Sequence, residues 1–356
     1  MPLPQLTIGD LKPRHPIIQG GMGIGVSLAR LAGAVAKAGG IGIISCAQIG
    51  YQHPRFQRAP LKANLEAIAT EYQKAKEIAG PEGIVGFNIM CAMNKYEKYV
   101  QRCVEVGADV IISGAGLPIH LPELVGAAKT KIAPIVSSAK AAKILLRTWA
   151  KRYQRTADFV VVEGPQAGGH LGFKYEDTAM KPEQMDEEFQ HILKEVAVYE
   201  EQFQRKIPVI FAGGVFDRKD IDHYFQLGAS GVQMASRFVV TEECDAPESY
   251  KKMYLNAQAT DVEVIKSPVG MPGRALKNRF TERTKVEAHI PIAKCRSCLS
   301  YDHCDRKTIP YCITEMLLNA VTDQPEDGLV FAGGQVHRIK KMTTVPELMA
   351  ELTEDN

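Results

Sequence analysis

The chain has 356 residues, of which 45% are hydrophobic and 24% charged, and its formal net charge is only +2. This composition is typical of an ordinary soluble globular protein and excludes a disordered or fibrous chain. Nothing in it indicates nucleic-acid binding. No apolar run reaches membrane-spanning length and the N-terminal segment lacks the pattern of a secretory signal, so we expect a cytoplasmic protein.

Short apolar runs alternate with longer segments of helical periodicity over the first 240 residues. This alternation is typical of repeated βα units on a parallel sheet. Connections of one kind, with no order-reversing break, favour a closed (β/α)8 TIM barrel over an open doubly wound sheet. We expect strands at 16–20, 41–45, 84–89, 109–113, 133–137, 158–163, 208–212 and 231–235, and helices at 28–38, 61–79, 96–106, 139–149, 188–203 and 218–227.

The pattern changes after residue 240. A partly helical stretch at 246–258 precedes residues 267–278, whose proline and glycine content predicts a loop. A cysteine-rich segment, a helix near 314–321 and a closing Glu-rich helix follow. We therefore expect residues 1–240 to form the barrel, and residues 241–356 to form an appended cap and C-terminal tail packed on it.

Functional groups in such barrels lie on the loops that follow the strands. The first run leads into a cluster of glycines, Gly20, Gly21, Gly23 and Gly25, interrupted by Met22. Without Cβ atoms, these residues let backbone N–H groups approach a planar or anionic ligand. A tight turn between strand and helix explains the cluster equally well.

Two further loops of small residues follow the seventh and eighth runs. The seventh run ends in Gly213 and Gly214, and the eighth continues through Gln233, Met234, Ala235 and Ser236. Loops at these two positions frequently form the phosphate site of a TIM barrel. We favour this interpretation over simple relief of crowding at the rim, because both loops consist of small residues.

The sixth run gives the most specific pattern, Glu163 followed by a loop with Gly168, Gly169 and His170. A histidine on a glycine-rich loop at the catalytic end of a barrel can exchange protons near neutral pH. Its glycine neighbours leave room for a cofactor ring against the backbone. We therefore expect His170 to have a functional role.

Together these motifs resemble a known enzyme family. The sequences PIIQGGMG, GFNI, VSSA, EGPQAGGHLG, AGGV and GASGVQMASRF occur in order between residues 16 and 238, and SPVGMPGRA at 267–275 extends them. The set resembles the nitronate monooxygenases, formerly called 2-nitropropane dioxygenases, and the related flavin-dependent enoyl-ACP reductases. The first loop reads QGGMG where many monooxygenases have Ala-Pro-Met, which leaves the subgroup open.

The resemblance implies that the barrel holds FMN and that His170 is the catalytic histidine. The implied phosphate contacts are Gly213, Gly214, Met234, Ala235 and Ser236, with Gln233 near the ring or the ribityl chain. The other implied FMN contacts are Gly21, Met22, Gly23, Asn88, Ser137, Glu163, Gly168 and Gly169.

Three functions follow as hypotheses. The first is oxidation of alkyl nitronates with O2 to carbonyl compounds and nitrite. The second is reduction of an enoyl-ACP thioester by NAD(P)H through FMN, which would need a basic patch for the acidic carrier protein. Candidates for that patch are Lys174, Arg237, Lys251 and Lys252. The third, from another class, is a barrel that binds a phosphorylated ligand without flavin.

Four cysteines, Cys295, Cys298, Cys304 and Cys312, lie close together in the sequence. Four thiolates of this kind can hold zinc or an iron–sulfur cluster, but packing cysteines without a metal are equally compatible with the spacing. Tyr175 and Met271 are candidates for the border of the substrate space. We expect a small-molecule substrate and no nucleic-acid or membrane partner, and the chain is compatible with a monomer or a homodimer.

Overall fold

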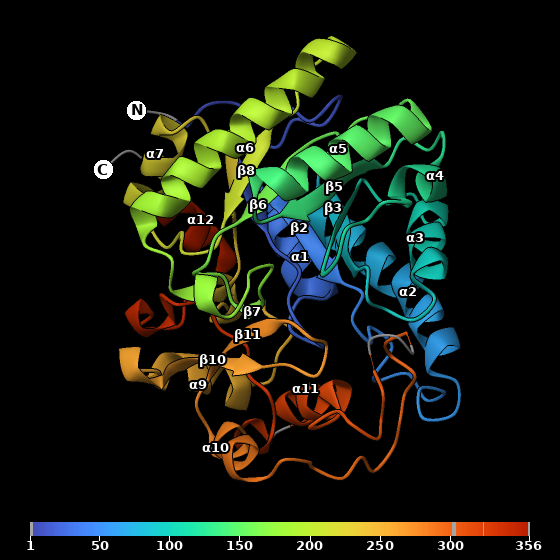
Figure 1. Ribbon diagram of the computed structural model, residues 1–356, viewed down its shortest axis with the longest axis vertical. Coiled ribbons are helices and arrows are strands. Elements are labelled where there is room, and N and C mark those ends of the chain that lie inside the picture. Colours follow the sequence, from blue (N-terminus) through green and yellow to red (C-terminus); the bar gives the residue numbers. More distant parts are fainter. Residues whose placement is uncertain (1–2, 301–303, 323, 355–356) are drawn as a thin grey trace.

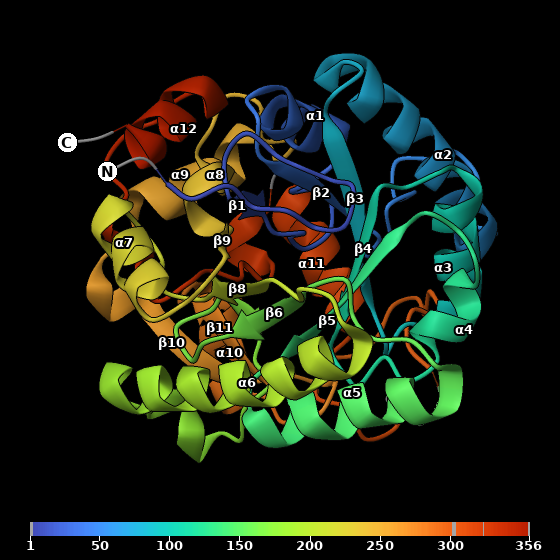
Figure 2. The same cartoon turned by 90° about the horizontal axis from the view of Figure 1, so that it is seen from above.

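The fold is a closed barrel of eight parallel strands, seen in a computed structural model that describes residues 3–300, 304–322 and 324–354. Each strand pairs with its neighbours in the order of the chain, and β9 closes the barrel on β1 (Figures 1 and 2). The TIM barrel expected from the sequence is thereby confirmed. The barrel strands are β1 (Ile17–Gln19), β2 (Ile41–Ser45), β3 (Ile84–Met90), β4 (Val110–Gly114), β5 (Lys131–Val136), β6 (Val160–Glu163), β8 (Val209–Ala212) and β9 (Gly231–Met234).

Helices form a ring around these strands (Figure 2). Close approach of helix and strand is possible where a residue lacks a side chain, as at Gly42 of β2, where a Cβ atom would overlap the backbone of Ala32. The ring and its rim consist of α1 (Ala29–Lys37), α2 (Pro60–Ala79), α3 (Tyr96–Glu105), α4 (Leu121–Val125), α5 (Ala139–Tyr153), α6 (Pro182–Phe203), α7 (Arg218–Gln226) and α8 (Ser236–Val239).

The barrel has two apolar layers, as expected for strands buried on both faces. Inside the barrel, Ile18, Ile43 and Ile210 belong to one cluster, which Leu6 and Ile8 of the N-terminal segment complete. Outward-facing strand residues pack with the helices in a second, larger cluster. The interior is therefore a packed core, and space for a ligand remains only at the ends of the strands.

The cap lies at one end of the barrel, below it in Figure 1. It contains α9 (Glu248–Asn256), β10 (Val262–Lys266), β11 (Pro272–Leu276), α10 (Arg279–Val286) and α11 (Ile313–Val321). A two-residue strand from the loop after β6, β7 (Gly169–His170), adds to β11 and makes a three-stranded sheet. The short 3-10 helices are η1 (Glu176–Ala179), η2 (Ala259–Asp261), η4 (Pro325–Asp327) and η5 (Val336–Arg338).

One expectation for this region is wrong. Residues 267–278 were expected to form a loop, but 272–276 form β11, which pairs with β10 along its whole length. Proline is compatible with this strand because it occupies the first position, and Gly273 pairs with His170 of β7. The closing helix, α12 (Val345–Thr353), returns to the barrel and packs on α1, α7 and α8. No helix among the described residues has the length and apolar character that crossing a membrane requires.

Candidate active site

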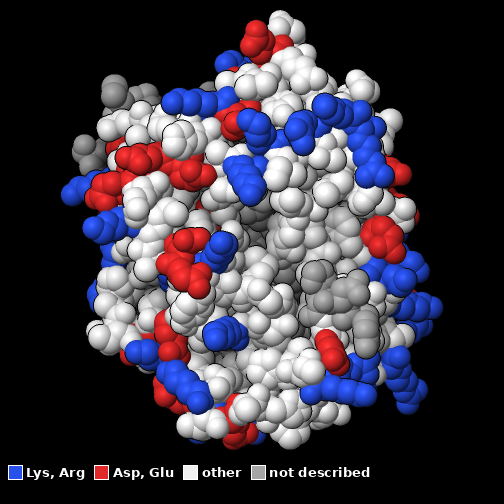
Figure 3. All heavy atoms as spheres, viewed as in Figure 1, with Lys and Arg blue, Asp and Glu red and all other residues white. Residues whose placement is uncertain are grey.

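A cavity of about 590 Å3 lies at the carboxyl ends of the barrel strands, between barrel and cap. The face of the molecule in Figure 3 is hollowed near its centre. Every residue that the resemblance implied for FMN binding or catalysis lines this cavity: Gly21, Met22, Gly23, Asn88, Ser137, Glu163, Gly168, Gly169, His170, Gly213, Gly214, Gln233, Met234, Ala235 and Ser236.

The first loop of the wall is held from both sides. The Ser45 hydroxyl at the end of β2 donates to the Gly23 carbonyl at 2.7 Å, and the Met22 amide donates to the Ser27 hydroxyl at 2.8 Å. Gly21 packs so closely on Asn88 of β3 that a Cβ atom would lie 2.5 Å from the Asn88 Cβ. Bare backbone therefore forms this part of the wall, which fits a flat ring.

The loops after β8 and β9 form the opposite part of the wall. Gly213 and Gly214 have φ angles of 93° and 101°, which side-chain-bearing residues rarely adopt. Ser236 begins α8, and its hydroxyl accepts a hydrogen bond from the Gly333 amide at 3.0 Å. Two loops of small residues beside the start of a short helix are the usual place for a phosphate in this fold. The wall therefore offers the bare backbone and the helix start that a flavin mononucleotide would need.

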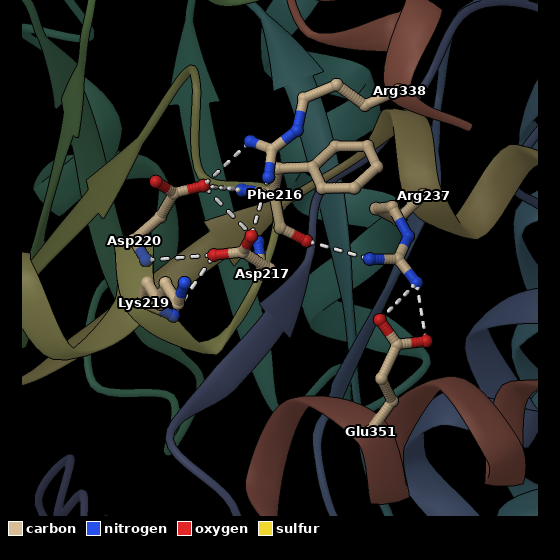
Figure 4. A network of polar contacts seen from close by, with 7 residues as sticks. All are labelled: Phe216, Asp217, Lys219, Asp220, Arg237, Arg338 and Glu351. Carbon is tan, nitrogen blue, oxygen red and sulfur yellow. Dashed lines mark hydrogen bonds and ion pairs between the residues drawn. The ribbon is translucent and has the colours of Figure 1, made fainter. Parts of the chain in front are cut away.

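A network of ion pairs and hydrogen bonds connects this region to the C-terminal segment (Figure 4). Arg237 donates to both carboxylate oxygens of Glu351 in α12, at 2.9 and 2.8 Å, and to the Phe216 carbonyl at 2.9 Å. Arg338 lies over the Phe216 ring, 4.1 Å from its centroid, and pairs with Asp217 at 2.5 Å. These contacts fix the loop that follows Gly213 and Gly214.

His170 reaches the cavity wall from β7. Its Nε2 atom lies 2.7 Å from the Ser267 hydroxyl oxygen, and the edge of its ring packs against Phe331 with the centroids 4.9 Å apart. Burial lowers the pKa of His170 to about 4. At neutral pH the imidazole is therefore uncharged, with one nitrogen free to accept a proton and the other able to donate one.

Glu163 ends β6 in the same wall. One of its carboxylate oxygens accepts hydrogen bonds from the Gly172 amide at 2.7 Å and from the Ser137 hydroxyl at 3.2 Å. Burial raises the pKa of Glu163 to about 7, although both hydrogen bonds and the nearby Arg274 favour the ionised form. The carboxyl group therefore keeps its proton to a higher pH than an exposed glutamate does.

Arg274 of β11 holds the loop between Glu163 and His170. It is only 5% exposed, and its Nη1 atom donates to the carbonyls of Pro165 and Ala167. Because β11 also pairs with β7, one cap strand fixes both the loop and the histidine. The planar guanidinium suits this task, since it can bridge two carbonyl groups at once.

The cap supplies an apolar wall that the sequence did not predict. Leu299, Leu329 and Phe331 line the cavity together with one face of α11, including Ile313 and Leu317. Met271, a predicted border residue, also lines the cavity. Tyr175 is not part of the lining: its ring is 50% exposed, and its hydroxyl donates to the Val264 carbonyl at 3.1 Å.

The four clustered cysteines do not form a recognisable metal site. Within residues 3–300, 304–322 and 324–354, no three His, Cys, Asp or Glu side chains are arranged to hold a metal ion. Cys298 lines the large cavity, Cys312 precedes α11, and burial raises the pKa of the Cys298 thiol to about 11. The expectation of zinc or an iron–sulfur cluster at Cys295, Cys298, Cys304 and Cys312 is therefore not supported.

The basic patch expected for a carrier protein is not formed as predicted. Lys251 is 3% exposed and pairs with Glu248 at 3.1 Å, while the Arg237 guanidinium is committed to Glu351. Of the four predicted residues, only Lys174 and Lys252 are exposed. Lys and Arg gather instead along the upper edge of the face in Figure 3, where Figure 1 places α5.

Comparison with known proteins decides the family. The family model described as nitronate monooxygenase matches residues 6–355. The chain belongs to the nitronate monooxygenase family.

Relatives of this family differ in their named activities. A (3aS,4S,5R,7aS)-5-hydroxy-7a-methyl-1-oxo-octahydro-1H-indene-4-carboxyl-CoA dehydrogenase of Mycobacterium tuberculosis is 29% identical over 271 residues, which are 76% of this chain. The match spans 65% of that relative's own length. A Staphylococcus saprophyticus protein named "Probable nitronate monooxygenase" is 24% identical over 82% of this chain and 84% of its own.

Solved structures share the fold. FabK from Thermotoga maritima has a TM-score of 0.71 at 24% identity, covering 96% of this chain and 92% of its own. Nitroalkane oxidase from Streptomyces ansochromogenes has a TM-score of 0.70 at 18% identity, covering 96% and 95%. Membership of a family named for an enzyme favours the enzymatic hypotheses over a barrel that only binds a phosphorylated ligand.

Proposed function

We propose that the protein is an FMN-dependent nitronate monooxygenase that oxidises alkyl nitronates with O2 to carbonyl compounds and nitrite. The observation that carries this proposal is the imidazole of His170, whose Nε2 atom lies 2.7 Å from the Ser267 hydroxyl oxygen in the wall of a glycine-lined cavity. In this proposal Gly21 and Asn88 would hold the ring of FMN, and Gly213, Gly214 and Ser236 would hold its phosphate. The bound flavin supplies the electron transfer.

His170 handles the proton in this proposal. An uncharged imidazole nitrogen removes the α-proton of a neutral nitroalkane, or its N–H donates to an oxygen of a nitronate that arrives already ionised. Ser267 fixes the orientation of the ring through its hydroxyl, and Phe331 packs against the ring edge. His170 is thus the catalytic residue, and Ser267 is a positioning residue.

The apolar wall contributes in two ways. Leu299, Leu329 and Phe331 offer a surface for the alkyl part of the substrate. Phe331 also packs against the edge of the imidazole, and burial of the imidazole is the reason that its pKa is lowered. The same burial keeps His170 unprotonated at neutral pH, and it makes the imidazole a weaker base than that of an exposed histidine.

A second candidate is reduction of an enoyl thioester by NAD(P)H through FMN. The observation in its favour is the extension of the cavity along Ile313, Leu317 and Val321 of α11, which offers space for a larger apolar acyl group. The relative from Mycobacterium tuberculosis is named for a carboxyl-CoA substrate. For this chain such a substrate remains an alternative.

Two assays on the flavin-loaded protein separate these functions. We expect O2 uptake with propionate 3-nitronate or an alkyl nitronate, with release of nitrite. We expect no oxidation of NAD(P)H with a crotonyl thioester under anaerobic conditions. Turnover of the thioester without nitrite production would replace the first function by the second, and failure of both substrates on flavin-loaded protein would contradict both.

A further inference from the structure

Gln48 is a polar residue of the large cavity to which neither the sequence motifs nor the proposed proton transfer gives a role. It lies in the loop after β2, lines the cavity and is only 4% exposed. Its φ angle is 45°, which residues with a side chain rarely adopt. Strained backbone of this kind occurs mainly at functional sites. The contacts of the Gln48 side chain indicate what that function is.

A chain of buried hydrogen bonds fixes the orientation of the Gln48 amide group. The Gly50 backbone amide donates to the Asn64 Oδ1 atom at 2.9 Å, so the other end of the Asn64 amide carries the N–H donors. The Asn64 Nδ2 atom donates to the Gln48 Oε1 atom at 3.1 Å and to the Tyr99 hydroxyl at 2.8 Å. Because a backbone N–H can only donate, this orientation satisfies every contact of the chain. The oxygen of Gln48 is therefore used inside the protein.

The nitrogen of Gln48 is the end of the amide that remains available. Its Nε2 atom donates to no described residue, and it is not one of the fully buried polar atoms that lack a partner. The small exposed surface of Gln48 therefore includes this nitrogen, and the residue lines the large cavity. A molecule bound in the cavity meets an N–H donor whose direction the protein has already fixed.

Gln48 and His170 come from opposite sides of the barrel. Strand β2 precedes the loop of Gln48, strand β6 precedes His170, and these two strands face each other because half of the closed ring separates them. Beside Gln48, the loop after β3 carries Met93, which pairs with Leu299 of the cap, and both residues line the cavity. A molecule whose reacting carbon meets His170 therefore reaches Gln48 with atoms remote from that carbon.

The charges around the cavity determine which acceptor suits this donor. Arg237 is the one Lys or Arg side chain among the described residues that line the cavity, and its guanidinium is committed to Glu351. A carboxylate held at Gln48 would be buried without a counter-charge, which is costly. An uncharged carbonyl oxygen accepts a hydrogen bond from the amide without that cost.

We propose that Gln48 is a specificity-determining residue that donates a hydrogen bond to an uncharged carbonyl oxygen of the substrate, remote from the carbon that is oxidised. The substrate class is then a nitroalkane, or its nitronate, whose chain also carries a ketone, ester or amide group. The inference rests on the proposed function for the reacting group, but not for the carbonyl contact. Asn64 and Tyr99 are positioning residues, because they act through Gln48.

Oxygen uptake by the flavin-loaded protein measures this preference. The substrates are nitronates of ω-nitro acid methyl esters of increasing length, each paired with the nitronate of the 1-nitroalkane of equal chain length. In Gln48→Leu and Gln48→Met, the ratio of kcat/KM for ester to kcat/KM for alkane should fall roughly tenfold for the best ester, as expected for one lost hydrogen bond. Turnover of the alkane shows that the variants are folded. Gln52→Leu, an exposed residue of the same loop outside the cavity, should keep the parental ratio.

Binding without turnover separates this inference from the proposed function. Fatty-acid N-methylamides, which carry a carbonyl but no nitro group, are titrated into the flavin-loaded protein while the visible flavin spectrum is recorded. We expect Kd to rise roughly tenfold in Gln48→Leu and Gln48→Met, but not in Gln52→Leu. This binding pattern without nitronate oxidation would end the proposed function and keep the carbonyl site. An unchanged ratio among nitronates that turn over, equal Kd values in parent and variants, or no amide binding to the parent would overturn the assignment of Gln48.

Discussion

At the scale of single residues, His170 owes its chemistry to its surroundings. A histidine in water has a pKa of about 6.5, but burial beside Phe331 lowers the pKa of His170 to about 4. The neutral form is therefore favoured in the folded protein down to that pH. Ser267 lies 97 positions away in the chain and reaches the histidine only because the cap folds over the barrel.

Replacing His170 tests its role directly. In His170→Asn we expect kcat/KM to fall roughly a hundredfold to ten-thousandfold, the usual contribution of a general acid or base, while flavin stays bound. In the parent, the rate that depends on the neutral imidazole should be level across neutral pH and decline only as the pH falls through about 4. The measurement is the pH profile of kcat/KM.

The matched control is His191→Asn. His191 is exposed on α6, beside Glu188 at 3.5 Å, and its loss should leave the rate unchanged. An acidic limb near the ordinary histidine pKa would show that the imidazole is not buried as described. Full activity of His170→Asn would remove it from the mechanism.

Glu163 gives a second residue-scale prediction, on stability. Its folded-state pKa of about 7 lies above the ordinary value of 4.5, so between these values the folded protein holds a proton that the unfolded chain has released. The stabilisation is complete below the ordinary pKa and is lost as the pH rises through about 7. Each pKa unit corresponds to about 1.4 kcal/mol.

The variant Glu163→Gln cannot titrate but can still accept the hydrogen bond from Gly172. The free energy of unfolding of the flavin-free variant should therefore rise relative to the parent between mildly acidic and mildly alkaline pH. Urea denaturation of both proteins at the two pH values measures this difference. A difference independent of pH would mean that Glu163 has an ordinary pKa.

The sequence predicted the barrel side of the site well, because small residues after strand ends carry a strong signal there. Gly21, Gly169 and Gly213 were predicted for that reason, and all three line the cavity. Ser267 and Phe331 were missed, because nothing in a single serine or phenylalanine of the cap tells which barrel loop it will meet.

At the scale of elements, strand β7 connects the catalytic loop to the cap. It has only two residues, too few for an alternating pattern, and its partner β11 begins with Pro272 and Gly273, which resemble a loop in composition. The barrel strands were predicted to within two residues, since each is a continuous apolar run. The small sheet of β7, β10 and β11 could not be predicted in this way.

Arg274 makes this sheet testable. In Arg274→Met the carbonyls of Pro165 and Ala167 lose their buried donor, so we expect a loss of roughly 1–3 kcal/mol in the free energy of unfolding and weaker flavin binding. Urea denaturation and fluorescence titration with FMN measure the two effects. Arg279→Met, which breaks an exposed pair with Asp327, serves as control and should change both much less. Unchanged flavin affinity in Arg274→Met would show that flavin binding does not depend on the hydrogen bonds from Arg274 to this loop.

At the scale of the whole molecule, a strand from a barrel loop belongs to the cap sheet, and a helix from the end of the chain packs on the barrel. Strand β7 of the barrel loop belongs to the cap sheet, and α12 at the end of the chain packs on α1, α7 and α8. The hydrogen bonds from Arg237 of α8 to Glu351 join the last barrel helix to the closing helix α12 (Figure 4). The sequence predicted a boundary at residue 240, where the alternation of apolar runs and helices ends. The pairing of β7 with β11 and the packing of α12 on the barrel helices both cross this boundary.

We therefore expect one cooperative unfolding transition. Trp149 is the single tryptophan of the chain and is fully buried in the barrel, so its fluorescence reports the barrel alone. Far-ultraviolet circular dichroism reports all helices, including those of the cap. The two signals should change at the same urea concentration in the flavin-free protein. Separate midpoints would show that the cap unfolds independently.

In the proposed function, a flavin mononucleotide occupies the cavity between the glycine loops and His170. The visible absorption spectrum of the purified protein, followed by mass identification of the released chromophore, is the measurement that tests this. We expect a yellow protein that releases FMN, and loss of FMN binding when Gly213 and Gly214 are both replaced by valine. A colourless protein that FMN cannot reconstitute would contradict it.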